Sequence, residues 1–250
     1  MPVLFEDGFE SGDVSKWDET VITSGENLQV VSPGIHGNYA ILCTSEDAGP
    51  DEYATVVKRV EPSATLFARG YFTINGGLPL PREGDRINLI IFWYGSNIAI
   101  GKANGVDQFQ LRVWDKINSR WIIANTGITP EIGRVYCIEL EWHANNVTRA
   151  YIDGEKVAEI DISGGVNDTL IEEVRVGLGI TVESGHPGLS VTCDTCAIGT
   201  EYIGPIITPL TGPLGIWTFP LLTWISTIFP NVATRLQTVL SNIKERFGRT

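Results

Sequence analysis

Basic residues and histidine are both scarce in this chain. Its 250 residues include 18 Lys and Arg against 30 Asp and Glu, which gives a formal net charge of −12. Because phosphate recognition requires clustered Lys and Arg, this balance excludes nucleic acid as the main partner. The three histidines are His36, His143 and His186. None of them stands in a spacing typical of a Ser-His-Asp nucleophilic site.

Cysteine is rare as well, and the four residues are Cys43, Cys137, Cys193 and Cys196. A zinc ribbon needs two Cys-x-x-Cys pairs, whereas the sequence offers one such pair, so zinc is not expected. Residues i and i+3 of a strand point to opposite faces, and we therefore expect Cys193 and Cys196 not to pair with each other. Two alternatives remain: the cysteines are small buried hydrophobic residues, or one cross-strand disulfide joins this segment to Cys43 or Cys137.

The first residues, 1–7, lack both the basic region and the long apolar run of a secretory signal peptide. A chain with no visible leader is either in mature form or leaves its cell by another route, for example within a virus particle. The sequence thus favours a virion or cell-surface location.

Turn residues are abundant, and 27 Gly and 13 Pro divide the chain into short segments. Runs rich in β-branched and aromatic residues lie between them and predict strands. These strands are expected at residues 38–43, 54–60, 65–74, 86–94, 98–102, 108–114, 120–125, 135–143, 148–152, 156–160, 173–181 and 189–198. Because one open sheet rarely holds so many strands, the sequence predicts an all-β sandwich of two antiparallel sheets.

Side-chain alternation predicts which face of each strand is buried. Residues 135–143 alternate between apolar and polar side chains, and the apolar set is expected in the core: Tyr136, Ile138, Leu140 and Trp142. Residues 86–94 are apolar at nearly every position, which predicts a strand covered on both faces. Asp153-Gly154 between two short strand segments predicts a two-residue hairpin.

Three segments, taken in order, match a known pattern. They are Phe5-Glu-Asp-Gly-Phe-Glu-Ser-Gly-Asp-Val-Ser-Lys-Trp-Asp18, the run Val135-Tyr-Cys-Ile-Glu-Leu-Glu-Trp142 followed by Thr148-Arg-Ala-Tyr-Ile-Asp-Gly-Glu-Lys-Val-Ala158, and residues 189–198. Together they resemble the concanavalin A-like lectin and glucanase family, including LamG-type modules. The resemblance covers residues 3–203 and implies a concanavalin A-like jelly-roll domain at residues 1–204. Lectins, glycosidases, lyases and virion domains share this fold, so fold alone does not choose the function.

The same resemblance implies a structural calcium ion that ties the first segment to the last strand. Its implied carboxylate ligands are Glu10, Asp13 and Asp194, because hard oxygen ligands suit Ca²⁺. The alternative is that Glu10 and Asp13 only shape a turn around Gly12.

Glu139 and Glu141 come nearest to a glycosidase pair. Retaining glycosidases of this fold carry a Glu-x-Asp-x-x-Glu strand, whose nucleophile and acid/base lie roughly 5 Å apart. The two glutamates share a strand face at about 7 Å along the backbone, but the central Asp and the third acid are missing. We therefore interpret them as an exposed polar face and assign no catalytic residue.

Sugar binding requires aromatic side chains beside polar donors and acceptors. The candidate residues are Trp93, Tyr94, Arg112, Trp114 and Trp121, and the alternative for these aromatics is core packing. Two N-glycosylation sequons begin at Asn146 and Asn167 and suggest a surface that could be glycosylated.

Residues 205–250 form a separate tail. Residues 202–234 carry no charge and are broken by five prolines. A Pro-rich hydrophobic arm is expected there, followed from Asn231 by an amphipathic helix. The tail residues expected to make contacts are Trp217, Phe219, Trp224, Phe229, Leu236, Leu240, Ile243 and Phe247. Three alternatives are packing on neighbouring subunits, membrane contact, and packing on the chain's own sandwich.

These observations favour a non-enzymatic surface protein, whose lectin-like domain is held in an assembly by its tail. A virion spike, turret or capsid-associated component is one such protein, and its partners would be copies of itself or other assembly subunits. The second hypothesis is a carbohydrate-binding module of a cell-surface or secreted protein. The third is a divergent glycoside hydrolase or lyase.

Overall fold

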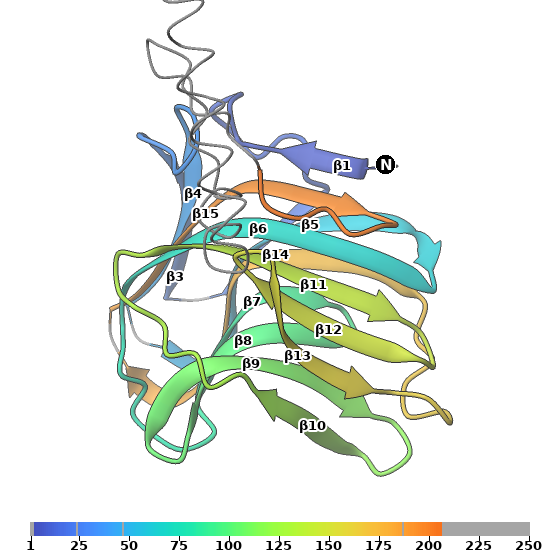
Figure 1. The fold of residues 1–250 in the computed structure, drawn as a ribbon. Helices are drawn as coiled ribbons and strands as arrows, with labels where there is room; N and C mark the ends of the chain where they lie inside the picture. Colours follow the sequence, from blue (N-terminus) through green and yellow to red (C-terminus); the bar gives the residue numbers. More distant parts are fainter. Residues whose placement is uncertain (1–2, 24, 47, 187, 207–250) are drawn as a thin grey trace, which may run out of the picture. The chain divides into compact units, whose positions relative to one another are not determined.

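The computed structural model describes residues 3–23, 25–46, 48–186 and 188–206, which form antiparallel strands (Figure 1). One sheet, here sheet A, has the order β13-β12-β11-β6-β15-β4-β3, and β1 also pairs with β15. Sheet B has the order β10-β9-β8-β7-β14-β5-β2. The strands are β1 Val3–Asp7, β2 Glu19–Ile22, β3 Glu26–Val31, β4 Ala40–Ser45, β5 Ala48–Ser63, β6 Thr65–Gly76, β7 Arg86–Phe92, β8 Ser96–Ala103, β9 Val106–Asp115, β10 Arg120–Asn125, β11 Val135–His143, β12 Val147–Ile152, β13 Glu155–Asp161, β14 Ile171–His186 and β15 Leu189–Gly199.

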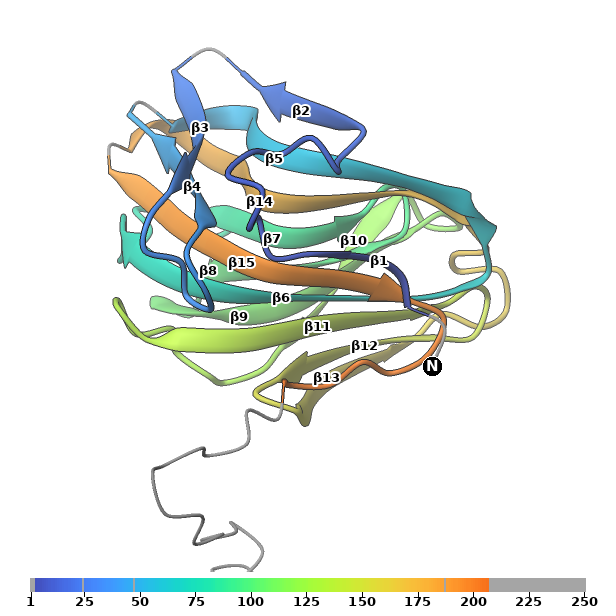
Figure 2. The same cartoon turned by 90° about the horizontal axis from the view of Figure 1, so that it is seen from above.

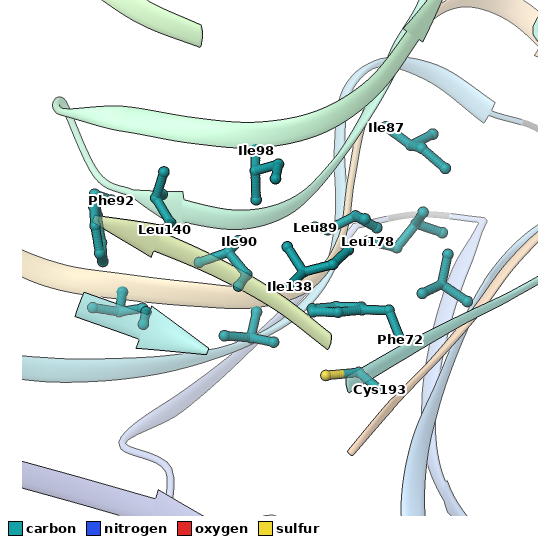
Figure 3. Packing of buried hydrophobic residues seen from close by; sticks show 14 of the residues in the cluster. Phe72, Ile87, Leu89, Ile90, Phe92, Ile98, Ile138, Leu140, Leu178 and Cys193 are labelled. Atoms are coloured by element: carbon teal, nitrogen blue, oxygen red, sulfur yellow. The ribbon is translucent and has the colours of Figure 1, made fainter. Parts of the chain in front are cut away.

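The two sheets lie face to face (Figure 2), and their inner faces form one hydrophobic core. Figure 3 shows part of this core, where Ile138 and Leu140 of sheet A lie near Ile90 of sheet B. The apolar face predicted for β11 is buried throughout, which confirms the alternation argument. Each such side chain contributes roughly 1.5–3 kcal/mol to stability on burial.

Each of the twelve predicted strands is present, whereas β1, β2 and β3 were not predicted. β2 and β3 lie at the edges of their sheets, and β1 is attached only to β15. Their side chains are largely exposed or half-buried. Edge strands need less apolar surface than central ones, so their sequences carry a weaker periodic signal.

The predicted hairpin at Asp153-Gly154 connects β12 to β13. Both residues have positive φ, at 54° and 87°. Two consecutive residues of this kind form the turn whose twist matches a two-residue hairpin. The Asp153 carboxylate also accepts a hydrogen bond from the Cys137 amide, which fastens the turn to β11.

The expectation that Cys193 and Cys196 point apart is wrong. The register of β15 shifts between Asp194 and Ala197, and Thr195 in between has a φ of 49°. This bulge adds a residue to the strand and turns both thiols inward. Their sulfur atoms lie 3.4 Å apart in the core. The described structure contains no disulfide, and all four cysteines are buried thiols, as the first alternative proposed.

Burial should make these thiols unreactive. It raises the pKa of Cys43 to about 12 and that of Cys137 to about 11, and it also raises the pKa of Cys193. Because the thiolate is the reactive form, we expect Ellman's reagent to detect no thiol in the native protein and four after unfolding. Rapid reaction of the native protein would contradict this. Two thiols after unfolding without reductant would show that one disulfide had formed, and peptide mapping would test whether it joins Cys193 to Cys196.

Two acidic side chains meet where β3, at the edge of sheet A, lies close to β5 of sheet B. Glu26 of β3 accepts a hydrogen bond from Ser45 and lies against Glu52 of β5. Burial, followed by the charge of Glu52, raises the pKa of Glu26 to about 7. The folded state therefore holds this proton more tightly than the unfolded chain does.

A group whose pKa is higher in the folded than in the unfolded state stabilises the protein at pH values below the unfolded-state pKa. This stabilisation is lost as the pH rises through the folded-state pKa. We expect the unfolding free energy to fall between about pH 4.5 and 7, with roughly 2 kcal/mol of the fall due to Glu26. Urea unfolding of Glu26→Gln across this range should show a flatter profile. Glu61→Gln, at an exposed site on β5, is the control. Equal slopes for Glu26→Gln and the unmodified protein would refute the assignment.

Predictions for the tail arm, its helix and its contacts fall on residues 207–250, outside the described residues. Among residues that the structure describes, no helix is long and apolar enough to cross a bilayer.

Candidate functional site

A groove of about 370 Å³ opens on the outer face of sheet B. Strands β7, β8 and β9 provide its floor, because their core residues point inward and the alternate residues point out. The lining residues are Asp51, Tyr53, Arg86, Asn88, Ile91, Phe92, Trp93, Tyr94, Gly95, Ser96, Asn97, Trp114 and Trp121. This volume lies within the range typical of small-ligand sites.

Four of the five predicted sugar-binding residues line this groove. Trp114 and Trp121 are directly opposite each other on β9 and β10, with ring centroids 5.5 Å apart. Trp93 and Tyr94 follow β7 on the turn to β8, and their centroids are 5.4 Å apart. Tyr94 is 73% exposed and Trp121 38% exposed. Aromatic rings are therefore accessible at both the β7–β8 turn and the β9–β10 pair.

The fifth residue, Arg112, lies beneath the aromatic wall and is only 4% exposed. Its guanidinium carbon is 5.4 Å from the centroid of the Trp121 ring, and the guanidinium carbon of Arg86 is 5.8 Å from the same centroid. Arg112 Nη1 donates to Gln110 Oε1 at 3.0 Å. Burial first, and the charge of Arg86 second, lowers the pKa of Arg112 to about 9. Burial also lowers the pKa of Arg86, against the opposing effect of Asp51.

Several buried polar atoms in and beside the groove have no hydrogen-bond partner. These atoms are Arg86 Nε, Asn88 Oδ1, Asn97 Oδ1 and Arg112 Nε, and they make up half of the eight such side-chain atoms among the described residues. Buried polar groups are normally satisfied, and an unsatisfied one costs about 1–3 kcal/mol. These four unpartnered atoms lie on the outer side of sheet B, in or next to the groove.

Arg175 of β14 holds the Trp93 side of the groove in place. Its guanidinium carbon lies 3.6 Å from the centroid of the Trp93 ring. Arg175 Nε also donates to Glu173 Oε1 at 2.6 Å. This arginine is therefore paired, and its role is to position the tryptophan.

Sequence reasoning missed the role of Asn167, which it interpreted as a glycosylation site. Asn167 is fully buried, and its Nδ2 donates to the backbone oxygens of Tyr94 and Trp114 at 3.1 and 3.0 Å. Its Oδ1 accepts from the backbone amide and hydroxyl of Thr169. The expected surface site is thus wrong at Asn167, whereas Asn146 is exposed. Asn167 joins the two aromatic sides of the groove.

Asn167→Asp keeps the shape of this side chain but turns an oxygen toward two carbonyls that now receive N–H groups. We expect it to lower the unfolding free energy by about 2–4 kcal/mol in urea titrations. Asn146→Asp makes the same chemical change at an exposed site and should shift the unfolding free energy by less than about 0.5 kcal/mol. Equal effects of the two substitutions would show that Asn167 does not join the groove.

A second hollow of about 390 Å³ lies beside the groove and shares Trp93 and Tyr94 with it. Its other lining residues are Arg59, Val60, Thr169, Leu170, Glu172 and Glu173. The two aromatic residues therefore form a ridge between adjacent hollows.

The glutamates considered for catalysis lie on the outer face of sheet A, and the expectation that they are exposed is wrong. Glu139 is 2% exposed and Glu141 is 4% exposed. Glu139 accepts hydrogen bonds from the amides of Ile203 and Gly204, both at 2.8 Å. Arg69 donates to the Gly204 oxygen. The chain after β15 thus crosses this face and covers Glu139, whose pKa burial raises.

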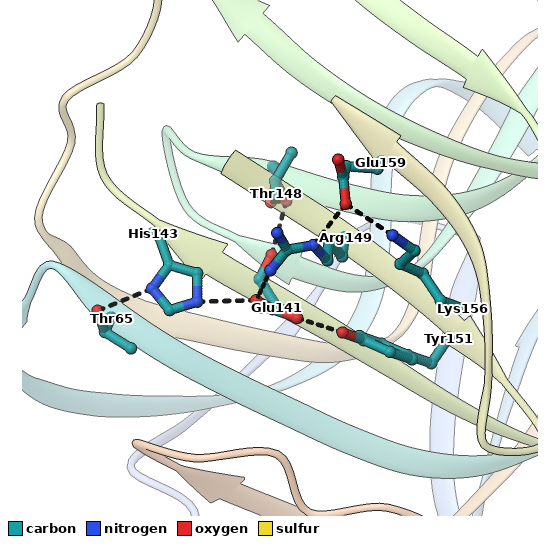
Figure 4. Close-up of polar contacts among 9 residues, drawn as sticks. Thr65, Glu141, His143, Thr148, Arg149, Tyr151, Lys156 and Glu159 are labelled. Atoms are coloured by element: carbon teal, nitrogen blue, oxygen red, sulfur yellow. Dashed lines mark hydrogen bonds and ion pairs between the residues drawn. The ribbon is translucent and has the colours of Figure 1, made fainter. Parts of the chain in front are cut away.

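Glu141 is at the centre of a separate polar network (Figure 4). It accepts hydrogen bonds from Arg149 and Tyr151, and it lies 2.8 Å from His143 Nε2. Burial first, and then Glu141, raises the pKa of Tyr151. Arg149 continues the network to Glu159 of β13. These contacts connect β11, β12 and β13, which is a structural role for Glu141.

The three carboxylates implied as calcium ligands face N–H and O–H donors. Glu10 accepts from the amides of Asn38 and Tyr39, and Asp194 accepts from the amide of His36. Asp13 is bonded to serines within its own turn. Glu10 and Asp194 therefore hold the same loop. Within the described ranges no three His, Cys, Asp or Glu side chains gather as a metal site would require, and calcium stays a prediction.

No family model and no curated protein matches this chain. Solved structures do match it. An endo-β-1,4-glucuronan lyase from the fungus Trichoderma reesei superposes with a TM-score of 0.58 at 18% identity, over 80% of this chain and 96% of that one. The cellulose-induced protein Cip1 superposes with a TM-score of 0.57 at 16% sequence identity, and the match covers 80% of this chain and 99% of Cip1. A third match is the ligand-binding domain of botulinum neurotoxin serotype D, in complex with N-acetylneuraminic acid. It superposes with a TM-score of 0.53 at 11% sequence identity, and the match covers 81% of this chain and 48% of that one.

At these identities the likeness shows the fold alone. The likeness and the two antiparallel sheets show a jelly-roll β-sandwich that fits the concanavalin A-like fold, as the sequence predicts.

Proposed function

We propose that this protein binds glycans through the groove of sheet B. The observation that carries the proposal is the combination of accessible aromatic rings with buried, unpartnered polar atoms at one site. Sugars present apolar C–H faces that stack on aromatic rings, and hydroxyl groups that satisfy donors and acceptors. The groove offers both kinds of contact within one cavity.

The aromatic ridge between the two hollows supports an extended ligand. Trp93 and Tyr94 border both cavities, so neighbouring sugar units could lie on either side of them. A chain of two or more sugars would bury more of these rings than a monosaccharide could. We therefore propose an oligosaccharide or a polysaccharide segment as the ligand.

Structures with the same fold support a glycan ligand. One of them is named for its action on glucuronan and another holds N-acetylneuraminic acid. The lyase also keeps an enzymatic alternative open for this chain. Loss of chain length in a bound polysaccharide would favour that alternative, and an intact polysaccharide would favour binding without catalysis.

Assembly through the tail and a virion location remain separate proposals. They rest on the uncharged composition of residues 202–234. Comparing the native mass of the full chain with that of a form ending at Gly204 would test the tail's part in assembly.

Removal of an exposed groove aromatic should weaken glycan binding. A glycan array of the full chain would first identify a ligand, and calorimetry would then compare Trp121→Ala and Tyr94→Ala with the unmodified protein. Each stacking ring should account for roughly a tenfold loss in affinity. The control is Tyr39→Ala, because Tyr39 is exposed to the same 38% as Trp121 but lies outside the groove.

Unchanged affinity in both groove variants would place the binding site elsewhere. Failure to bind any glycan on a broad array would contradict the proposal as a whole.

A further inference from the structure

Positive charge is concentrated at one end of the groove. Arg86 lines the wall, and Arg112 lies behind Trp121. Both guanidinium carbons lie over the Trp121 ring, at 5.8 Å for Arg86 and 5.4 Å for Arg112 from its centroid, and the charge of Arg86 helps to lower the pKa of Arg112. Like charges that lie close together are unfavourable unless something compensates them.

The described residues provide little compensation. No carboxylate among them forms an ion pair with Arg112, whose one hydrogen-bond partner is the neutral amide of Gln110. Asp51 is the acidic side chain that lines the groove, and its charge acts on Arg86. Nearby Glu173 is already bonded to Arg175.

A buried cation without an anionic partner lowers stability, and burial of such groups is rare unless they are paired. An anion from a ligand would supply the missing partner. The unpartnered Nε of Arg86, which lines the groove, is a donor that an oxyanion can accept from. Oδ1 of Asn88 and Oδ1 of Asn97 are acceptors, which suit the hydroxyl groups of a sugar.

We infer that the groove binds an acidic glycan, in which a carboxylate or sulfate oxyanion lies at Arg86 while the adjoining sugar stacks on the aromatic wall. Arg112 adds a second positive charge from behind Trp121. This inference rests on the proposed function and specifies its ligand class. Neutral glucans lack the group that would offset these two charges.

The test compares oligosaccharides of β-1,4-linked glucuronic acid with cello-oligosaccharides of equal length and with their sulfated derivatives. Calorimetry would use the full chain at low and at high salt. We expect the acidic ligands to bind at least tenfold more tightly at low salt, with the difference shrinking as salt screens the charges.

Arg86→Met and Arg112→Met should lose this preference, because the affinity for the acidic sugars should fall further than the affinity for the neutral sugar. Without ligand, Arg112→Met should also melt at a higher temperature than the unmodified protein, because it removes an unpaired buried charge while keeping the volume. If Arg112 had a purely structural role, the Arg112→Met variant would instead be less stable than the unmodified protein. Arg120→Met, on β10 with its side chain 70% exposed, is the control for the ligand preference and should leave that preference unchanged.

The outcomes separate the two levels of the proposal. Equal affinity for acidic and neutral sugars, with no effect of either arginine variant, would overturn the acidic ligand and leave the groove as a glycan site. Binding of none of the three sugars, together with a blank glycan array, would overturn the glycan function itself. A preference for the sulfated form over the carboxylate would support the inference and identify the oxyanion.

Discussion

The burial of two inner sheet faces against each other is the constraint on which this structure depends. Each strand must alternate, so every residue assigned to the core places its neighbours on the outside. In β9, Val113 and Leu111 are fully buried in the core, and Arg112 therefore lies on the outer face. The same alternation places Trp114 beside it. The groove is thus composed of outward-facing residues that alternate along the strands with the core residues.

Local departures from alternation determine the details of both faces. The register of β7 shifts between Asn88 and Ile90, so that Leu89 and Ile90 both face the core while Asn88 and Ile91 line the groove. The bulge in β15 has a similar result, since it brings Cys193 and Cys196 to the same side. An extra residue in a strand redirects the side chains on both sides of it.

The two outer faces illustrate different uses of buried polar groups. On sheet A, Glu139 and Glu141 have their partners within the protein, which fixes the chain after β15 and joins three strands. On sheet B, the buried groups beside the groove retain unpartnered atoms. Satisfied networks stabilise a fold, whereas unsatisfied ones are tolerated where a ligand completes them. The two faces differ in degree: among the described residues, four unpartnered side-chain atoms lie in or beside the groove, whereas one, Arg69 Nε, lies beside Glu139 on sheet A.

The sequence by itself determined the sandwich, the twelve strands from β4 to β15, the hairpin at Asp153 and four of the groove's aromatic residues. These follow from side-chain period and turn chemistry, which are local properties. Only the tertiary structure decided that Glu139 is covered by residues 203–204, that the thiols of β15 meet, and that Asn167 connects Tyr94 with Trp114. Each of these depends on a bulge or on contacts between residues distant in sequence, and neither leaves a periodic signal in the chain.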